Sequence, residues 1–190
     1  MKTGTSGILS KLLYRCRVKE VKKYIKNGNI LEVGCGGWPF VNELKRKSKY
    51  VGLDIDEEAI NRVKNLYPDC LFIVKDIEKD VVFSTNKFKN IIMLAVLEHL
   101  KNPIISLVNL SNNLCGDGRI ILTTPSPKAS LLLKIGSKLG LFDKSADKEH
   151  ETMLGMNDFQ LLENKTRLKI KVYKKFLFGL NQIVVLTSEY

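Results

Sequence analysis

Apolar residues recur along the chain in two patterns, short continuous runs and sets with helical spacing. The continuous runs predict strands at residues 30–33, 50–54, 71–74, 91–96 and 119–124. Helical spacing predicts helices between these runs, at residues 11–27, 40–48, 57–66 and 103–114. Because right-handed crossovers place helices on both faces of a sheet, this alternation indicates a doubly wound α/β fold with a mostly parallel sheet.

The end of the chain follows a different pattern. Residues 168–176 alternate and residues 181–188 are apolar, with Phe178-Gly179-Leu180 between them. Two consecutive strands without a helix between them predict an antiparallel pair at one edge of the sheet. The uninterrupted apolar run at 91–96 is typical of a parallel strand that is buried on both faces, so we expect it near the middle of the sheet.

Length and composition indicate one globular domain over residues 1–190. Hydrophobic residues make up 44% and charged residues 27% of the 190-residue chain, which is ordinary for a globular protein with a single core. The longest apolar run, 91–97, is far shorter than the roughly 20 residues needed to cross a bilayer. The first residues are polar and lack the apolar core of a signal peptide, so a cytoplasmic location is expected.

The chain is strongly basic, with a formal net charge of +11. Such a surface attracts phosphates, nucleic acid or an anionic membrane, so the charge predicts the sign of a partner and not its identity. The four cysteines lie far apart, without a Cys-x-x-Cys pair. This spacing argues against a zinc ribbon and against a disulfide framework.

A candidate nucleoside site follows from residues at the ends of three predicted strands. The run at 30–33 enters a glycine turn that contains Gly34 and Gly36, and such a turn lets backbone N–H groups approach a ligand closely. Asp54 ends the second strand, from where a carboxylate can accept both hydroxyls of an adenosine ribose. Asp76 follows the third strand and is placed to meet the adenine edge. A glycine turn alone can also be a plain strand-to-helix connection, but the acids beside it favour a binding site.

Five motifs resemble those of the class I S-adenosylmethionine-dependent methyltransferases, and among them the small free-standing enzymes of types 11 and 23. In chain order they are Ile30-Leu-Glu-Val-Gly-Cys-Gly-Gly, Val51-Gly-Leu-Asp-Ile-Asp, Lys75-Asp76, Val96-Leu-Glu-His-Leu and Gly118-Arg-Ile-Ile-Leu-Thr-Thr-Pro. The resemblance implies a Rossmann-like, seven-stranded sheet with a reversed last strand. It also implies S-adenosylmethionine as the cofactor.

The resemblance assigns ten cofactor-binding residues. They are Glu32, Gly34, Cys35 and Gly36 for the methionine part, Asp54 at the ribose, Asp76 and Ile77 at the adenine, Leu94 and Ala95 in the floor, and Ile55, without an assigned part of the cofactor. The chain departs from the family pattern at Trp38, where a small residue is usual, and at Asn90, where an acid is usual. Trp38 packs either on the cofactor or on the core, and the core is favoured. Neither departure removes a group that methyl transfer needs.

His99 and His150 are the only histidines and are the candidate general bases, because an imidazole titrates near neutral pH. Transfer to an ionised acceptor requires chiefly alignment, so a base is optional and His99 can equally be a structural residue. Glu98-His99 with His150 also resembles the metal-using methyltransferases. Their additional Glu is Ala95 in this chain, so no metal is expected.

Two basic segments stand apart from the sheet pattern, the predicted N-terminal helix within residues 1–27 and an insertion at 128–144. The insertion is amphipathic, with leucines interleaved with lysines such as Lys134 and Lys138. It is predicted either to form a lid over an apolar or lipid-linked acidic acceptor, in peripheral contact with a membrane, or to pack on its own domain.

The sequence therefore predicts methyl transfer from S-adenosylmethionine to an O or N atom of a small-molecule, cell-surface or lipid-linked acceptor that is acidic or lipid-bearing. Three alternatives are an RNA methyltransferase, a nucleoside-binding regulatory protein without turnover, and a nicotinamide-dependent oxidoreductase. The last is disfavoured because the glycine turn lacks the third glycine of that fingerprint. The sequence predicts no oligomeric state.

Overall fold

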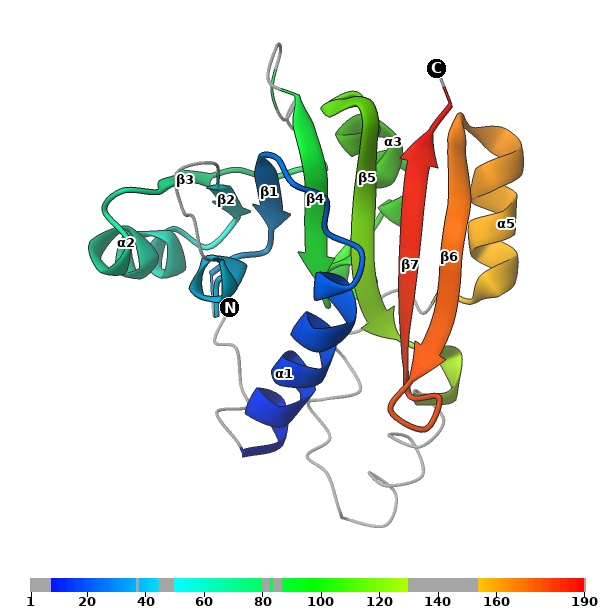
Figure 1. Ribbon diagram of the computed structural model, residues 1–190, viewed down its shortest axis with the longest axis horizontal. Helices are drawn as coiled ribbons and strands as arrows, with labels where there is room; N and C mark the ends of the chain where they lie inside the picture. The colour runs from blue at the N-terminus through cyan, green and yellow to red at the C-terminus, as the bar shows by residue number, and fades with distance from the viewer. Residues whose placement is uncertain are drawn as a thin grey trace.

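The computed structural model describes residues 8–36, 38–44, 50–79, 83, 87–129 and 154–189. Seven strands form one sheet in the order β3-β2-β1-β4-β5-β7-β6 (Figure 1). The strands are β1 (Ile30–Val33), β2 (Tyr50–Asp54), β3 (Leu71–Val74), β4 (Phe88–Leu94), β5 (Leu114–Pro125), β6 (Leu168–Phe176) and β7 (Asn181–Ser188).

The strand directions confirm the predicted sheet. β3, β2, β1, β4 and β5 run parallel, whereas β7 is antiparallel to both β5 and β6. β7 therefore lies between β5 and β6, which makes it the reversed last strand that the sequence predicted. β4 lies in the middle of the sheet, as its uninterrupted apolar run indicated.

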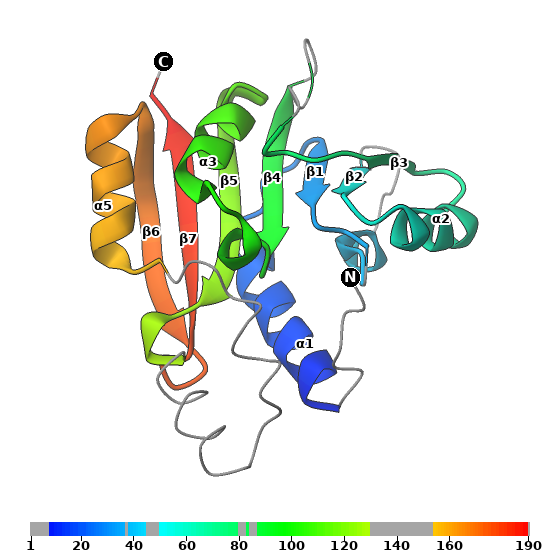
Figure 2. The same cartoon turned by 180° about the vertical axis from the view of Figure 1, so that it is seen from behind.

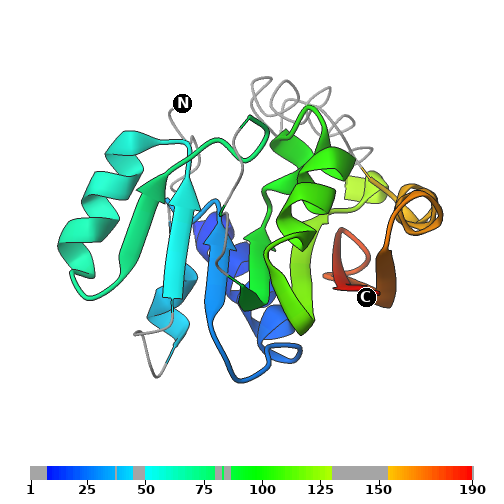
Figure 3. The same cartoon turned by 90° about the horizontal axis from the view of Figure 1, so that it is seen from above.

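Helices cover both faces of the sheet. α1 lies on one face and α3 on the other, as Figures 2 and 3 show. None of the helices in the described part of the chain has the length and apolar character needed to cross a membrane. The helical segments are α1 (Ile8–Lys22), the short 3-10 helix η1 (Phe40–Glu43), α2 (Glu57–Leu66), the 3-10 helix η2 (Leu97–His99), α3 (Pro103–Ser111) and α5 (Met156–Lys165).

The core divides into two clusters because successive side chains of a strand point to opposite faces. On the face covered by α3 and α5, Ile91 and Met93 of β4 share a cluster with Leu107. On the other face, Ile92 packs in a cluster with Val18 of α1. Both clusters consist of fully or almost fully buried apolar side chains, so the sheet is a rigid platform for the residues at its ends.

Several predicted element boundaries need correction. The predicted helix at 11–27 begins earlier and ends at Lys22, and the predicted helix at 40–48 is helical only over Phe40–Glu43, with 45–49 outside the described residues. The predicted strand at 91–96 starts at Phe88 and ends at Leu94. The sequence did not predict α5, because its buried residues Phe159 and Leu162 form only a narrow apolar stripe among polar residues.

The hairpin between β6 and β7 turns through an unusual backbone. Leu177 and Phe178 have positive φ angles of 51° and 56°, and Gly179 follows with 85°. The N–H groups of Gly179 and Leu180 donate to the carbonyl oxygens of Phe176 and Leu177, at 3.1 and 3.0 Å. A left-handed conformation costs roughly 1–2 kcal/mol for each residue with a side chain, so this turn is built at a cost that Asn or Gly would avoid.

Candidate functional site

The carboxyl ends of β1 and β4 lie side by side, and the chain leaves them in opposite directions along the sheet. In a parallel sheet this switch point opens a crevice for a ligand. The glycine turn follows β1 here, and its N–H groups are held within the chain. Gly34 and Cys35 donate to the Leu53 carbonyl at 2.8 and 3.1 Å, and Gly36 donates to Oδ2 of Asp54 at 2.7 Å. In this structure the N–H groups of Gly34, Cys35 and Gly36 are therefore bonded to the end of β2.

Close packing, rather than free N–H groups, explains the glycines of this turn. Gly34 has a φ of +79°, and a Cβ there would overlap Cγ2 of Val96. A Cβ on Gly36 would lie 2.7 Å from both the Ala59 Cβ and Oδ2 of Asp54. The absence of side chains thus brings the turn into direct contact with the segment after β4 and with the start of α2.

Asp54 fastens the turn to the end of β2. Besides the Gly36 bond, its Oδ1 accepts from the Asp56 N–H at 2.9 Å, and Asp56 in turn caps α2 through the Ala59 N–H at 3.0 Å. Each carboxylate oxygen can accept two hydrogen bonds, so both oxygens of Asp54 keep one acceptor position. The next side chain, Ile55, is 67% exposed at the same end of β2.

Asp76 lies just beyond β3, at the carboxyl end of that strand. Its Oδ1 accepts from the Glu78 N–H at 3.0 Å, and its Oδ2 lies 3.2 Å from Nζ of Lys79. The Glu78 N–H, and then Lys79, hold the pKa of Asp76 below its usual range, so the group is a carboxylate at neutral pH. The neighbouring Ile77 side chain is buried in the core, which leaves only its backbone for contact with a ligand.

Glu32 points into the protein and organises the loop that follows the turn. Its buried Oε2 accepts from the Phe40 N–H at 2.7 Å and from the Tyr50 hydroxyl. Burial raises the pKa of Glu32 to about 8, and the two hydrogen bonds only partly oppose that shift. Cys35 is also buried, and burial, with Glu32 and Asp54 nearby, raises the pKa of its thiol well above the usual range.

Trp38 does not join the core, in contrast to the expectation that it would. Its side chain is 45% exposed and meets the Tyr14 ring of α1 edge-on, with centroids 5.5 Å apart. Among the described residues the Tyr14 hydroxyl has no hydrogen-bond partner, although the oxygen is buried. Burial, followed by Glu32 and Glu43, raises the pKa of Tyr14, so its phenol stays neutral.

Four polar residues from distant parts of the chain meet beside β4, and we call them the α1 cluster: Arg17, Glu98, Thr124 and Asn181. Nε of Arg17 donates to Oδ1 of Asn181 at 3.1 Å, and Thr124 donates to Oε2 of the buried Glu98 at 2.9 Å. Burial lowers the pKa of Arg17, and the Glu98 charge opposes that shift. No local spacing relates the members of this cluster, so the sequence alone did not predict it.

The end of β4 lies between the glycine turn and the α1 cluster and forms the floor of the crevice. Ala95, which directly follows Leu94, has a φ of 58° and donates its N–H to the Thr123 carbonyl at 2.8 Å. The Thr123 hydroxyl is buried and has no partner in the described part of the chain. His99 is exposed at the end of η2, whereas His150 and most of the 128–144 insertion lie outside the described residues.

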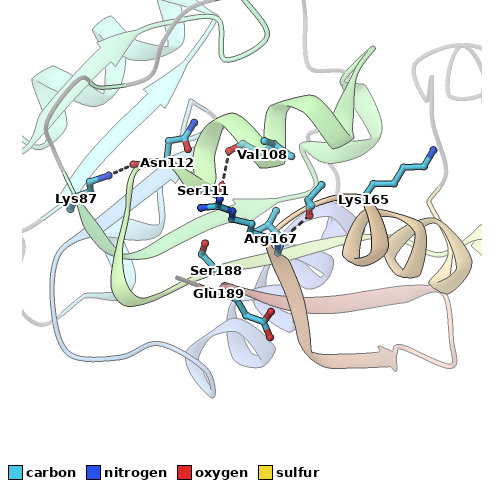
Figure 4. A pocket seen from close by; sticks show the side chains of 10 residues that line it. Lys87, Val108, Ser111, Asn112, Lys165, Arg167, Ser188 and Glu189 are labelled. Carbon is cyan, nitrogen blue, oxygen red and sulfur yellow. Dashed lines mark hydrogen bonds between the residues drawn. The ribbon is translucent and has the colours of Figure 1, made fainter.

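A hollow lies at the opposite end of the parallel strands from the switch point, between the ends of α3 and α5 (Figure 4). It encloses about 500 Å³ and is lined by Lys87, Lys165 and Arg167, among others. Lys87 donates to the Asn112 carbonyl at the end of α3, and Lys165 is in the last turn of α5. Cations at helix C-termini are a common stabilising feature, so this hollow needs no ligand to explain its charge. No group of three potential metal-ligating side chains occurs within the described residues.

Comparison with solved structures shows that this fold recurs among methyltransferases. A TehB-like SAM-dependent methyltransferase from Corynebacterium glutamicum is similar over 95% of both chains, with 16% identity and a TM-score of 0.67. A magnesium protoporphyrin IX methyltransferase from Synechocystis, with bound SAH, is similar over 98% of this chain and 90% of its own, with 16% identity and a TM-score of 0.68.

A methyltransferase from Haloferax volcanii, described as putative and solved in complex with the Trm112 activator, gives a TM-score of 0.75 at 10% identity, over 95% of this chain and 91% of that one. No curated protein matches the sequence. The family model of the methyltransferase domain matches residues 9–167, which is most of the chain. Together with the strand order, this match confirms the resemblance read from the motifs, and the chain belongs to the methyltransferase-domain family.

Proposed function

We propose that this protein transfers the methyl group of S-adenosylmethionine to an O or N atom of a small-molecule or lipid-linked acceptor. The observation that carries the proposal is the combination of Asp54, the exposed Ile55 and the glycine turn at one switch point of the sheet. A carboxylate with free acceptor positions suits a ribose diol, and an exposed apolar side chain beside it suits a purine face.

The residues at the switch point fit such a cofactor. Gly34 and Gly36 place no side chain of their own at the switch point, although the N–H groups of Gly34, Cys35 and Gly36 are already bonded within the chain. The Asp54 carboxylate keeps one acceptor position on each oxygen, and these positions suit the two hydroxyls of a ribose.

When bound, S-adenosylmethionine supplies an electrophilic methyl group on a sulfonium. In our proposal Asp54 orients the ribose, Ile55 covers the base, and Glu32 holds the loop around Trp38 through the Phe40 N–H. Glu32 acts as a positioning residue, because its carboxylate is buried among protein groups. Alignment of two reactants can contribute ~7–11 kcal/mol, so a rigid sheet end can supply much of the acceleration without a base.

The acceptor, in this proposal, lies on the α1 side of the same crevice. Arg17 would attract an acidic acceptor, and His99 is the described candidate for removing its proton where one must leave. His150 is a second candidate that lies outside the described residues. A small-molecule acceptor is supported by the similar Synechocystis protein, which is named as a methyltransferase of magnesium protoporphyrin IX. The net charge of +11 instead favours an RNA acceptor, so RNA is the second candidate.

Isothermal titration with S-adenosylmethionine, S-adenosylhomocysteine and NAD tests the cofactor assignment. We expect the first two to bind and NAD not to bind. Asp54→Asn should weaken binding at least tenfold, because the amide cannot accept from both ribose hydroxyls at once. Asp117→Asn, at the opposite edge of the sheet, is the matched control and should leave affinity unchanged. Binding of NAD alone would contradict the proposal.

Incubation with labelled S-adenosylmethionine separates the acceptor classes. We expect label to enter a lipid or small-molecule extract and not an RNA fraction from the same cells. Labelled RNA alone would select the second candidate. Tight binding of S-adenosylhomocysteine without transfer to any fraction would instead support a regulatory protein that has kept the fold.

A further inference from the structure

The tip of the β6–β7 hairpin carries a side chain that the fold does not explain. Phe178 is 96% exposed, the most exposed of the large apolar side chains in the described part of the chain. It also adopts a left-handed backbone conformation that a phenylalanine disfavours. Gly or Asn at this position would suit both the turn and the solvent better, so neither packing nor turn geometry accounts for the aromatic ring.

The hairpin tip lies on the side of the sheet where the parallel strands have their carboxyl ends, as the switch point does. β5 ends at Pro125, which pairs with Asn181 at the start of β7, so the tip projects beyond the carboxyl ends of the parallel strands. Ser126 fixes the tip there, since its N–H and hydroxyl donate to the carbonyls of Leu180 and Gly179. Figures 1 and 2 show the tip at the same end of the molecule as the start of α1.

Two described lysines flank the tip. Lys128 lies beside the turn, with its Cδ 3.9 Å from where a Cβ on Gly179 would be, and Lys175 precedes the turn on β6. Both side chains are exposed, and neither has an ion-pair partner among the described residues. The sequence contains no acidic residue at 125–129 or 174–183, so no nearby charge in these segments offsets the lysines.

We propose that this tip anchors the protein to an anionic lipid surface, with Phe178 inserted among the lipids and Lys128 and Lys175 against the headgroups. A protruding aromatic ring flanked by lysines matches the interfacial region, where apolar insertion and headgroup attraction add. A protein partner fits less well, because stable protein interfaces bury roughly 800 Å² on each side around an apolar centre. The described surface at the tip offers one projecting ring flanked by two exposed lysines.

Docking in this orientation would bring the crevice at the switch point to the membrane, where a lipid-linked acceptor is concentrated. The inference therefore deepens the proposed function by assigning the source of the acceptor. It can fail on its own, because membrane binding is measured without cofactor or turnover.

Co-sedimentation of the full chain with vesicles tests the anchor. We expect binding to phosphatidylcholine vesicles that contain about one-third phosphatidylglycerol, and much weaker binding to pure phosphatidylcholine. Phe178→Ser should reduce the partition coefficient about tenfold. The matched control is Leu66→Ser, a 69% exposed leucine at the end of α2, which should bind as the wild type does. Exchange of both Lys128 and Lys175 for Gln should also cost about tenfold on the anionic vesicles alone.

Two further variants separate docking from a structural role. Phe178→Gly should raise the melting temperature, because Gly accepts the left-handed turn, and should still lose vesicle binding. Phe178→Trp in a Trp38→Phe background should show a blue shift of its emission on anionic vesicles. The proposal is overturned if the wild type does not bind anionic vesicles, if Phe178→Ser and Leu66→Ser bind equally, or if the emission does not shift.

Discussion

The two sides of the crevice are built from different kinds of contact. On one side, the glycine turn and Asp54 belong to segments close in sequence, and the Gly36–Asp54 bond spans 18 residues. On the other side, the α1 cluster joins Arg17 to Asn181 across 164 residues. The first side can be read from local spacing, whereas the second exists only after the sheet has formed and α1 has docked. The side proposed to hold the cofactor can thus be predicted from the sequence, whereas the side proposed to hold the acceptor cannot.

The strongest test of the glycine-turn side is Gly34→Ala. We expect a loss of about 3 kcal/mol or more in the free energy of unfolding, because a Cβ at φ +79° would overlap Cγ2 of Val96. Urea denaturation measures it. The control Gly116→Ala adds a Cβ with nothing within 4 Å and should change stability by less than about 0.5 kcal/mol. Val96→Ala in the Gly34→Ala background should recover part of the loss.

A substitution that nearly keeps the side-chain volume tests the α1 cluster. Arg17→Met should cost about 1–2 kcal/mol, because it leaves the buried Glu98 without its nearby positive charge. Glu98→Gln combined with Arg17→Met should cost less than the sum of the single changes. Lys19→Met, an exposed residue on the same helix, is the control. If the two sides are independent, affinity for S-adenosylhomocysteine should stay unchanged; a tenfold loss would show that they act together.

Glu32 links the turn to the loop and gives the fold a pH dependence. Its pKa is about 8 in the folded protein against 4.5 for the ordinary carboxyl, so the folded state keeps a proton that the unfolded chain releases. Stability from this group is therefore lost as pH rises from about 4.5 to 8, by up to about 1 kcal/mol per pH unit. Glu32→Gln mimics the protonated acid and should gain stability over the wild type across that window, in urea titrations at several pH values.

Tyr50→Phe provides an independent check of the same prediction. The Tyr50 hydroxyl donates to Glu32 and lowers its pKa, so its removal should extend the pH-dependent window to higher pH. Parallel stability curves for wild type and Glu32→Gln would contradict the prediction.

The sequence predicted what periodicity and local motifs determine. Continuous apolar runs were sufficient to predict the parallel strands, because strands buried on both faces must be apolar whatever they pack against. An alternating segment followed by an apolar one was sufficient to predict the terminal hairpin. The same reasoning missed α5, whose burial depends on the sheet, and it placed Trp38 in the core although its side chain is 45% exposed. Hydrophobic pattern identifies elements, but not which element covers a given side chain.

The site followed the same division. Asp54 and the glycines were found by their spacing, but their hydrogen bonds to one another were not, since those depend on the exact meeting of two loops. The positive φ of Ala95 has no sequence signal at all, because alanine rarely adopts it and no motif marks it. The contacts of Tyr14 and Arg17 could not be predicted either, because they depend on how α1 packs against the sheet.

The smallest expected effect concerns Ala95, which lies between the two sides. Its φ of 58° is one that glycine adopts freely, so Ala95→Gly should raise the free energy of unfolding by about 0.5–1 kcal/mol in urea titrations. Ala59→Gly within α2 should have the opposite sign, a loss of about 1 kcal/mol, because that residue is helical. Strain kept at a functional site is commonly offset elsewhere, so we expect Ala95→Gly also to weaken S-adenosylhomocysteine binding a few-fold. A variant that is more stable and binds equally well would show that the strained backbone at Ala95 serves neither side.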